Sequence, residues 1–137
     1  MTLVPARVVV VDDDVDARAL LCEVLTAGGV EILGEAGDGL DGVRIALEHE
    51  PDVVLMDLRM PVLGGIEATQ QLRDHLPSTQ VVMLTAYGDH ESQRGAGRAG
   101  AYAYLVKDTS SRLLLEVVSQ ATKFKRGLDA RETVPDP

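Results

Sequence analysis

Val8-Val9-Val10-Val11-Asp12-Asp13-Asp14 is the stretch that decides the fold of this 137-residue chain. Four consecutive β-branched apolar residues are typical of a short strand that is buried on both faces, as strands of parallel sheets are. The run changes abruptly into three aspartates, so acidic side chains lie at the carboxyl end of the predicted strand. Buried parallel strands are joined by helices that cover the sheet. We therefore expect the rest of the chain to alternate between strands and helices.

The downstream sequence follows this alternation. Apolar residues recur at helical spacing from Ala17 to Leu25, and Gly28-Gly29 ends that helix. Further helices are predicted over about 40–47, 66–76, 89–100 and 114–121, and further strands over about 30–36, 53–56, 81–84 and 103–106. Five strands separated by helices predict a parallel sheet with helices on both faces. In such sheets a ligand site forms outside the carboxyl ends of the strands.

Composition is consistent with one globular domain. The chain is 45% hydrophobic and 26% charged, and its length is that of a single domain. The single cysteine, Cys22, excludes an internal disulfide. A net charge of −9 argues against binding of nucleic acid by this chain itself, because phosphate binding relies on a positive field.

Polar side chains follow four of the five predicted strands. Asp12 and Asp13 follow the first, Asp57 the third, Thr85 the fourth and Lys107 the fifth. Three clustered carboxylates repel one another unless a cation lies between them, and Mg²⁺ prefers such oxygen ligands. An aspartate in this setting can act as a nucleophile and form an aspartyl phosphate. A hydroxyl and an ammonium group can then bind the phosphoryl oxygens.

Each of these residues, taken alone, has an ordinary structural explanation. Asp13 or Asp14 can cap the first helix. Asp57 can be a turn residue, the Thr85 hydroxyl can simply end a strand, and Lys107 can be a solvated charge. The functional interpretation is favoured because these residues fall at the ends of different parallel strands.

Two other acidic motifs partly match the same residues, and the sequence argues against both. An EF-hand calcium loop needs glycine where Ala17 stands, and it is not preceded by a strand. Its candidate ligands would be Asp12, Asp14, Asp16 and Glu23. The start of a haloacid-dehalogenase-type phosphatase is similar to Asp12-x-Asp14, but Asp16 stands where threonine is expected, and the chain is short for that class.

Four motifs in order carry a resemblance to a known family: Val10-Val11-Asp12-Asp13, Met56-Asp57-Leu58-Arg59-Met60-Pro61, Leu84-Thr85-Ala86, and Gly100 to Asp108. Over about residues 6–122 the chain resembles the receiver domains of two-component response regulators. Asp108 after Lys107 is most similar to the subfamily with a LuxR-type helix-turn-helix output domain. The resemblance implies an α/β, flavodoxin-like fold, with a doubly wound five-stranded parallel sheet in the order 2-1-3-4-5.

The resemblance also implies a role for each site residue. Asp57 would accept a phosphoryl group from the phosphohistidine of a sensor histidine kinase. Mg²⁺ would be bound by Asp13, Asp57 and the backbone carbonyl of Arg59, with Asp12 acting through a water. The phosphoryl-binding and switch residues would be Thr85, Ala86, Lys107 and Tyr104, and Arg59 and Tyr87 would tune the loss of the phosphoryl group to water. Such a protein is a signalling switch and not an enzyme, since it catalyses only its own phosphorylation and dephosphorylation.

The sequence departs from the family pattern in the loop after Pro61 and at Asp108, where many family members have proline after the lysine. The loop Val62-Leu63-Gly64-Gly65 lacks the usual Asp or Asn before its glycine, although two glycines still permit a left-handed turn. The helix predicted over 89–100 contains Gly95 and Gly97, each of which costs about 1 kcal/mol relative to alanine. We therefore expect this helix to be short or frayed.

Residues 1–122 are expected to form the receiver domain, and residues 123–137 the end of the last helix and the start of a linker or tail. DNA would be bound only through an output domain absent from this chain. No apolar run approaches the roughly 20 residues of a membrane span, so no membrane partner is expected and the expected location is the cytoplasm. A homodimer is compatible with the resemblance, and the apolar periodicity favours no particular dimer face.

Overall fold

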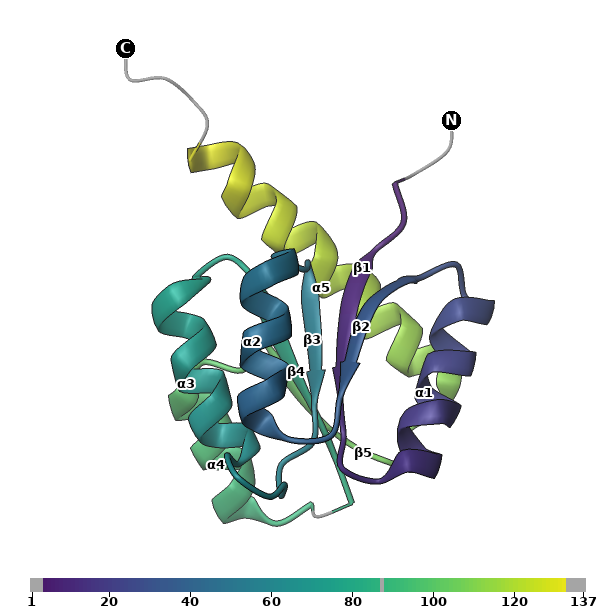
Figure 1. Cartoon of the computed structure of the whole chain (residues 1–137). Helices are drawn as coiled ribbons and strands as arrows, with labels where there is room; N and C mark the ends of the chain where they lie inside the picture. The colour runs from purple at the N-terminus through teal and green to yellow at the C-terminus, as the bar shows by residue number, and fades with distance from the viewer. Residues whose placement is uncertain (1–3, 87, 133–137) are drawn as a thin grey trace.

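The sheet has five parallel strands in the order β2-β1-β3-β4-β5, with helices on both faces (Figure 1). The computed structural model describes residues 4–86 and 88–132. The doubly wound architecture expected from the sequence is therefore confirmed, including the strand order. Along the chain the elements are β1 (Arg7–Val11), α1 (Val15–Ala27), β2 (Glu31–Ala36), α2 (Gly39–His49), β3 (Val53–Met56), α3 (Gly65–His75), β4 (Gln80–Thr85), α4 (His90–Ala99), β5 (Ala103–Val106) and α5 (Ser111–Glu132).

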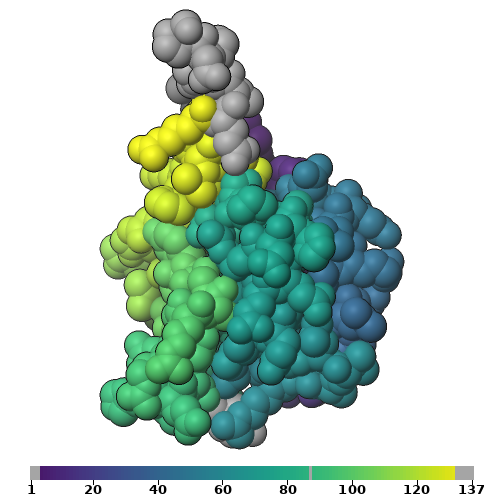
Figure 2. Space-filling view, turned by 90° about the vertical axis from the view of Figure 1, so that its left-hand side faces the viewer, coloured from purple at the N-terminus to yellow at the C-terminus, as the bar shows by residue number. Residues whose placement is uncertain are grey.

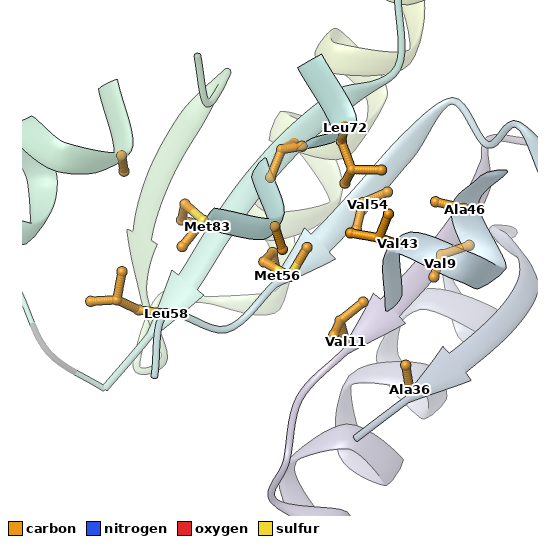
Figure 3. Close-up of a cluster of buried hydrophobic side chains, with 13 residues drawn as sticks. Val9, Val11, Ala36, Val43, Ala46, Val54, Met56, Leu58, Leu72 and Met83 are labelled. Atoms are coloured by element: carbon orange, nitrogen blue, oxygen red, sulfur yellow. The ribbon is translucent and has the colours of Figure 1, made fainter. Parts of the chain in front are cut away.

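Alternate residues of each strand enter two separate hydrophobic cores, because successive side chains of a strand point to opposite faces. Figure 3 shows Val9 and Val11 of β1 and Val54 and Met56 of β3 on the face covered by α2 and α3. Ala96 brings α4 to the same face. The other face is covered by α1 and α5, and its core includes Val8, Val10, Val53, Leu55, Leu25, Leu114, Val118 and Ala121. Burial on both faces explains why the strands read as continuous apolar runs.

All five strands point toward one edge of the sheet, which is the lower edge in Figure 1. At this edge Asp14 caps α1, since its side chain accepts hydrogen bonds from the backbone N–H groups of Asp16 and Ala17. The helix begins at Val15, within the stretch that an EF-hand would need as a loop. The capping explanation thus applies to Asp14, and it leaves Asp12 and Asp13 available for a site.

The loop between β3 and α3 has a different geometry from the one suggested by its two glycines. The left-handed residue is Val62, with φ of 69°, whereas Gly64 is extended with φ of −71°. Gly65 is required for packing, because an added Cβ would overlap the carbonyl oxygen of Asp57 and approach the Met83 side chain to 2.9 Å. A β-branched residue in the left-handed region is strained, so this loop must be held by its surroundings.

Helix α5 is 22 residues long, and its second half extends past the edge of the sheet where the strands begin (Figure 1). It is anchored there by Asp52, which is buried just before β3. The Asp52 carboxylate accepts a hydrogen bond of 2.9 Å from Arg126 and another of 2.9 Å from the backbone N–H of Arg7, and Lys125 lies 3.7 Å away. Arg126 also donates to the carbonyl oxygens of Val4 and Pro5.

Among the described residues, α4 is the shortest helix, with ten residues between the N-cap Asp89 and the left-handed C-cap Gly100. It is only one residue shorter than α2 and α3 and fills the span predicted for it, so the expected shortness and fraying stay a prediction. No helix within residues 4–86 and 88–132 combines the length and apolar character needed to cross a bilayer.

The two glycines Gly65 and Gly97 should respond oppositely to alanine. Gly65→Ala should lower the free energy of unfolding by about 2–3 kcal/mol, because the new methyl group has no space beside the Asp57 carbonyl. Gly97→Ala should raise it by about 0.5–1 kcal/mol, since nothing lies within 4 Å of the added Cβ in the interior of α4. Urea denaturation followed by circular dichroism measures both, and a stabilised Gly65→Ala would contradict the packing described here.

Arg126→Ala should destabilise the protein by about 1–3 kcal/mol, because it removes the main hydrogen-bonding cation from a buried carboxylate. Arg131→Ala is the matched control, since Arg131 is an exposed cation in the last turn of the same helix. The control should stay within about 0.5 kcal/mol of the native chain. Thermal denaturation distinguishes the two, and equal effects would show that the Asp52 anchor contributes nothing.

Candidate functional site

Three carboxylates meet at the carboxyl edge of the sheet. Asp12 and Asp13 follow β1, and Asp57 follows β3, which is the neighbour of β1 in the sheet. The backbone continues this pairing, because the N–H of Asp57 donates to the carbonyl of Val11 over 2.9 Å. One carboxylate oxygen from each of the three aspartates lies within 4.8 Å of the others. The sequence prediction that these residues converge is confirmed.

Asp12 and Asp57 are buried, with only 1% and 7% of their surface exposed, while Asp13 is exposed. Each buried side chain is fixed by a backbone N–H from its own loop. Asp57 Oδ1 accepts from Leu58 N over 2.8 Å, and Asp12 Oδ1 accepts from Asp14 N over 2.9 Å. These bonds leave the Oδ2 atoms of Asp12 and Asp57 as the oxygens available to other partners.

Lys107, the residue after β5, brings its ammonium group to both Oδ2 atoms. Nζ lies 2.8 Å from Asp12 Oδ2 and 3.5 Å from Asp57 Oδ2. The approach to Asp12 is a close ionic contact without hydrogen-bond geometry, so the buried Asp12 Oδ2 accepts no directed hydrogen bond. The predicted convergence of Lys107 with the carboxylates is therefore confirmed.

The cluster holds more negative than positive charge, and this imbalance shifts the pKa values of Asp57 and Lys107. Burial, followed by repulsion from Asp12, raises the pKa of Asp57 to about 6, although Lys107 and the Leu58 N–H act in the other direction. Partial burial of Lys107 disfavours its charge, but contacts with Asp12 and Asp57 prevail and raise its pKa. The ammonium is thus charged at neutral pH, and it faces more negative charge than it can neutralise.

The residues of this cluster fit a hard divalent cation. All three offer carboxylate oxygens, which are the ligands Mg²⁺ prefers, and the buried Asp12 Oδ2 has only the ionic contact with Lys107. A cation there would relieve the repulsion that raises the pKa of Asp57. The acidic pocket is therefore a candidate metal site.

The other predicted site residues surround this cluster. Thr85 is fully buried at the end of β4, and its carbonyl accepts from the backbone N–H of Lys107 over 2.8 Å. Ala86 and Arg59 are exposed in the loops that follow β4 and β3. Tyr104 is half-buried on β5 and packs against the core beneath α2, α3 and α4. Tyr87 lies outside the described residues, and the individual roles of these residues stay predictions.

Sequence reasoning missed Asp89. Its carboxylate caps α4 by accepting from Ser92 N over 2.7 Å, and it lies 3.8 Å from the Arg59 guanidinium. An aspartate followed closely by a helix is a recognisable cap signal. The ion pair to Arg59 joins residues 30 positions apart, and no local pattern indicates it.

These features define a class of protein: a doubly wound sheet whose carboxyl edge carries a cluster of three carboxylates with one lysine. The sequence profile of the response regulator receiver domain matches residues 8–119. The chain belongs to the receiver domain family of two-component response regulators, as the motifs indicated.

Relatives and solved structures agree with this assignment. The transcriptional regulatory protein PdtaR of Mycobacterium tuberculosis is 39% identical over 94% of this chain and 62% of its own length. The receiver domain of the putative response regulator NarL from the same species has a TM-score of 0.83 and 32% identity, over 87% of this chain and 97% of that one. A LuxR-family response regulator from Aurantimonas sp. SI85-9A1 has a TM-score of 0.80 and 28% identity, over 88% and 86%. The chain spans 52–62% of the length of the curated transcriptional regulators compared.

In metal-free buffer, Asp57→Asn should be more stable than the native chain by about 1–2 kcal/mol at pH 7.5. The pKa of Asp57 is raised to about 6 in the folded state, so folding favours the protonated carboxyl. The contribution of Asp57 to stability therefore falls as pH rises from about 4 through 6, and the amide variant lacks this contribution. Urea midpoints at pH 4, 5, 6 and 7.5 measure the difference, which should grow with pH. A difference that is constant with pH would contradict the charge repulsion.

Proposed function

We propose that this protein is a phospho-accepting switch in which Asp57 takes a phosphoryl group from a histidine kinase with the help of Mg²⁺. The observation that carries the proposal is the contact of Lys107 with Asp57 and Asp12 inside a cluster of three carboxylates. No other described residues within 4–86 and 88–132 form such a cluster of potential metal ligands.

In the proposed reaction, a carboxylate oxygen of Asp57 attacks the phosphorus of the donor. The bond between phosphorus and the donor nitrogen breaks, and the electron pair leaves with that nitrogen. Leu58 N–H holds Asp57 Oδ1, so Oδ2 is the oxygen that faces Lys107. Bound Mg²⁺ supplies neutralisation of phosphoryl charge, and Asp12, Asp13 and Asp57 would hold it together with the Arg59 carbonyl.

The remaining residues of the site bind the product and report its presence. Lys107 pairs with one phosphoryl oxygen, and the Thr85 hydroxyl donates to another, with Ala86 beside it. Tyr104 responds from β5 when Thr85 moves, and Arg59 and Tyr87 set how fast the phosphoryl group is lost to water. The protein has no turnover on outside substrates, and in this respect it is a switch and not an enzyme.

The partners follow from the same proposal. A sensor histidine kinase supplies the phosphoryl group, and transcription is controlled through a DNA-binding output domain. The curated transcriptional regulators that resemble it extend beyond the matched region, which supports this arrangement. The protein acts in the cytoplasm, and a homodimer is compatible with this role.

Incubation with Mg²⁺ and acetyl phosphate should add the mass of one phosphoryl group to the native chain and none to Asp57→Asn. Asp14→Asn is the matched control, because asparagine caps a helix about as well as aspartate and Asp14 already serves as a cap. This control should be phosphorylated as the native chain is. Intact-protein mass spectrometry with and without EDTA gives the answer, and a gain that survives Asp57→Asn would place the acceptor elsewhere.

A further inference from the structure

One exposed carboxylate joins the loop after the phosphorylation site to the start of α4. Asp89 Oδ1 accepts from Ser92 N over 2.7 Å, and Oδ2 accepts from the Ser92 hydroxyl over 3.0 Å. The same Oδ2 lies 3.8 Å from an Arg59 guanidinium nitrogen. Backbone and side-chain hydrogen bonds from Ser92 lower the pKa of Asp89, so the carboxylate is charged at neutral pH. Arg59 thus pairs with a fixed anion, two residues beyond Asp57.

The surroundings leave Arg59 room to move. Arg59, Asp89 and Ser92 line an open hollow of about 630 Å³ between α3 and α4, and Figure 2 shows these two helices side by side on one face. More than half of the Arg59 side chain is exposed, so its pairing with Asp89 is a weak, exchangeable contact. A new anion near Asp57 would compete with Asp89 for the guanidinium.

We propose that Asp89 is a positioning residue that restrains Arg59 and thereby shortens the lifetime of the phosphoryl group on Asp57. In hydrolysis, a water oxygen attacks the phosphorus, and the bond between phosphorus and the Asp57 oxygen breaks. The electron pair returns to the Asp57 carboxylate, the protons of the water pass to phosphate and solvent, and inorganic phosphate leaves. An Arg59 guanidinium released from Asp89 pairs with the phosphoryl oxygens and covers the side from which water approaches.

This inference rests on the proposed phosphorylation of Asp57, and it adds a residue outside the acidic cluster. Asp89 also holds Ser92 in the first turn of α4 through both of its carboxylate oxygens. A phosphoryl group that draws Arg59 toward Asp57 therefore loosens one of the contacts at the α4 start. The ion pair couples the charge on Asp57 to the first turn of α4.

The test is the half-life of the phosphorylated protein. Asp89→Asn keeps a good N-cap but removes the charge that holds Arg59. It should lengthen the half-life roughly two- to fivefold, the range expected for loss of an exposed ion pair. Release of inorganic phosphate after acetyl phosphate is removed, in excess Mg²⁺, measures the rate. An unchanged or shorter half-life would overturn the proposal.

Two controls separate the ion pair from a general charge effect. Glu91→Gln removes a neighbouring exposed negative charge from the first turn of α4 and should leave the half-life unchanged. Asp89→Asn in an Arg59→Gln background should have no effect, because the residue it restrains is gone. An equal effect in that background would also overturn the proposal. Absence of phosphorylation in the native chain would refute the proposed function instead, so the two failures are distinguishable.

Discussion

One ammonium group faces three carboxylates, and this shortage of positive charge governs the site. Lys107 contacts Asp12 and Asp57 together, and repulsion still raises the pKa of Asp57. The carboxylates cannot relax apart, because Asp12 and Asp57 follow adjacent strands and are fixed by backbone N–H groups. The stability of the sheet therefore maintains an unfavourable charge arrangement, and a cation or a change in the charge of Asp57 relieves it.

Aspartate serves three purposes in this molecule, and the surroundings of each residue decide which purpose it serves. Exposed Asp14 and Asp89 cap helices through backbone N–H groups. Buried Asp52 is satisfied by cations and anchors α5 to the start of β3. Buried Asp57 is incompletely neutralised and belongs to the acidic cluster. The difference between Asp52 and Asp57 lies in the donors that reach each carboxylate, since both are buried and both flank β3.

The sequence was sufficient for the sheet and for the acidic cluster. The run from Val8 to Val11 and its counterparts encode burial on both faces, and a parallel sheet brings the ends of such strands together. Side-chain contacts between residues far apart in the sequence were not predictable in this way. The Arg59–Asp89 pair and the Arg126–Asp52 anchor depend on side-chain directions that follow only from the assembled fold. The left-handed residue in the β3–α3 loop was also beyond local rules, because Val62 is a residue type that disfavours it.

Strand β3 contains only four residues, a length of about 13 Å. It separates two buried aspartates, Asp52 and Asp57, whose interactions differ. Asp52, just before the strand, anchors α5. Asp57, just after the strand, belongs to the acidic cluster. The two ends of the strand can therefore be altered separately: a substitution at Asp52 affects the anchoring of α5, and one at Asp57 affects the acidic cluster, while the apolar strand between them stays the same.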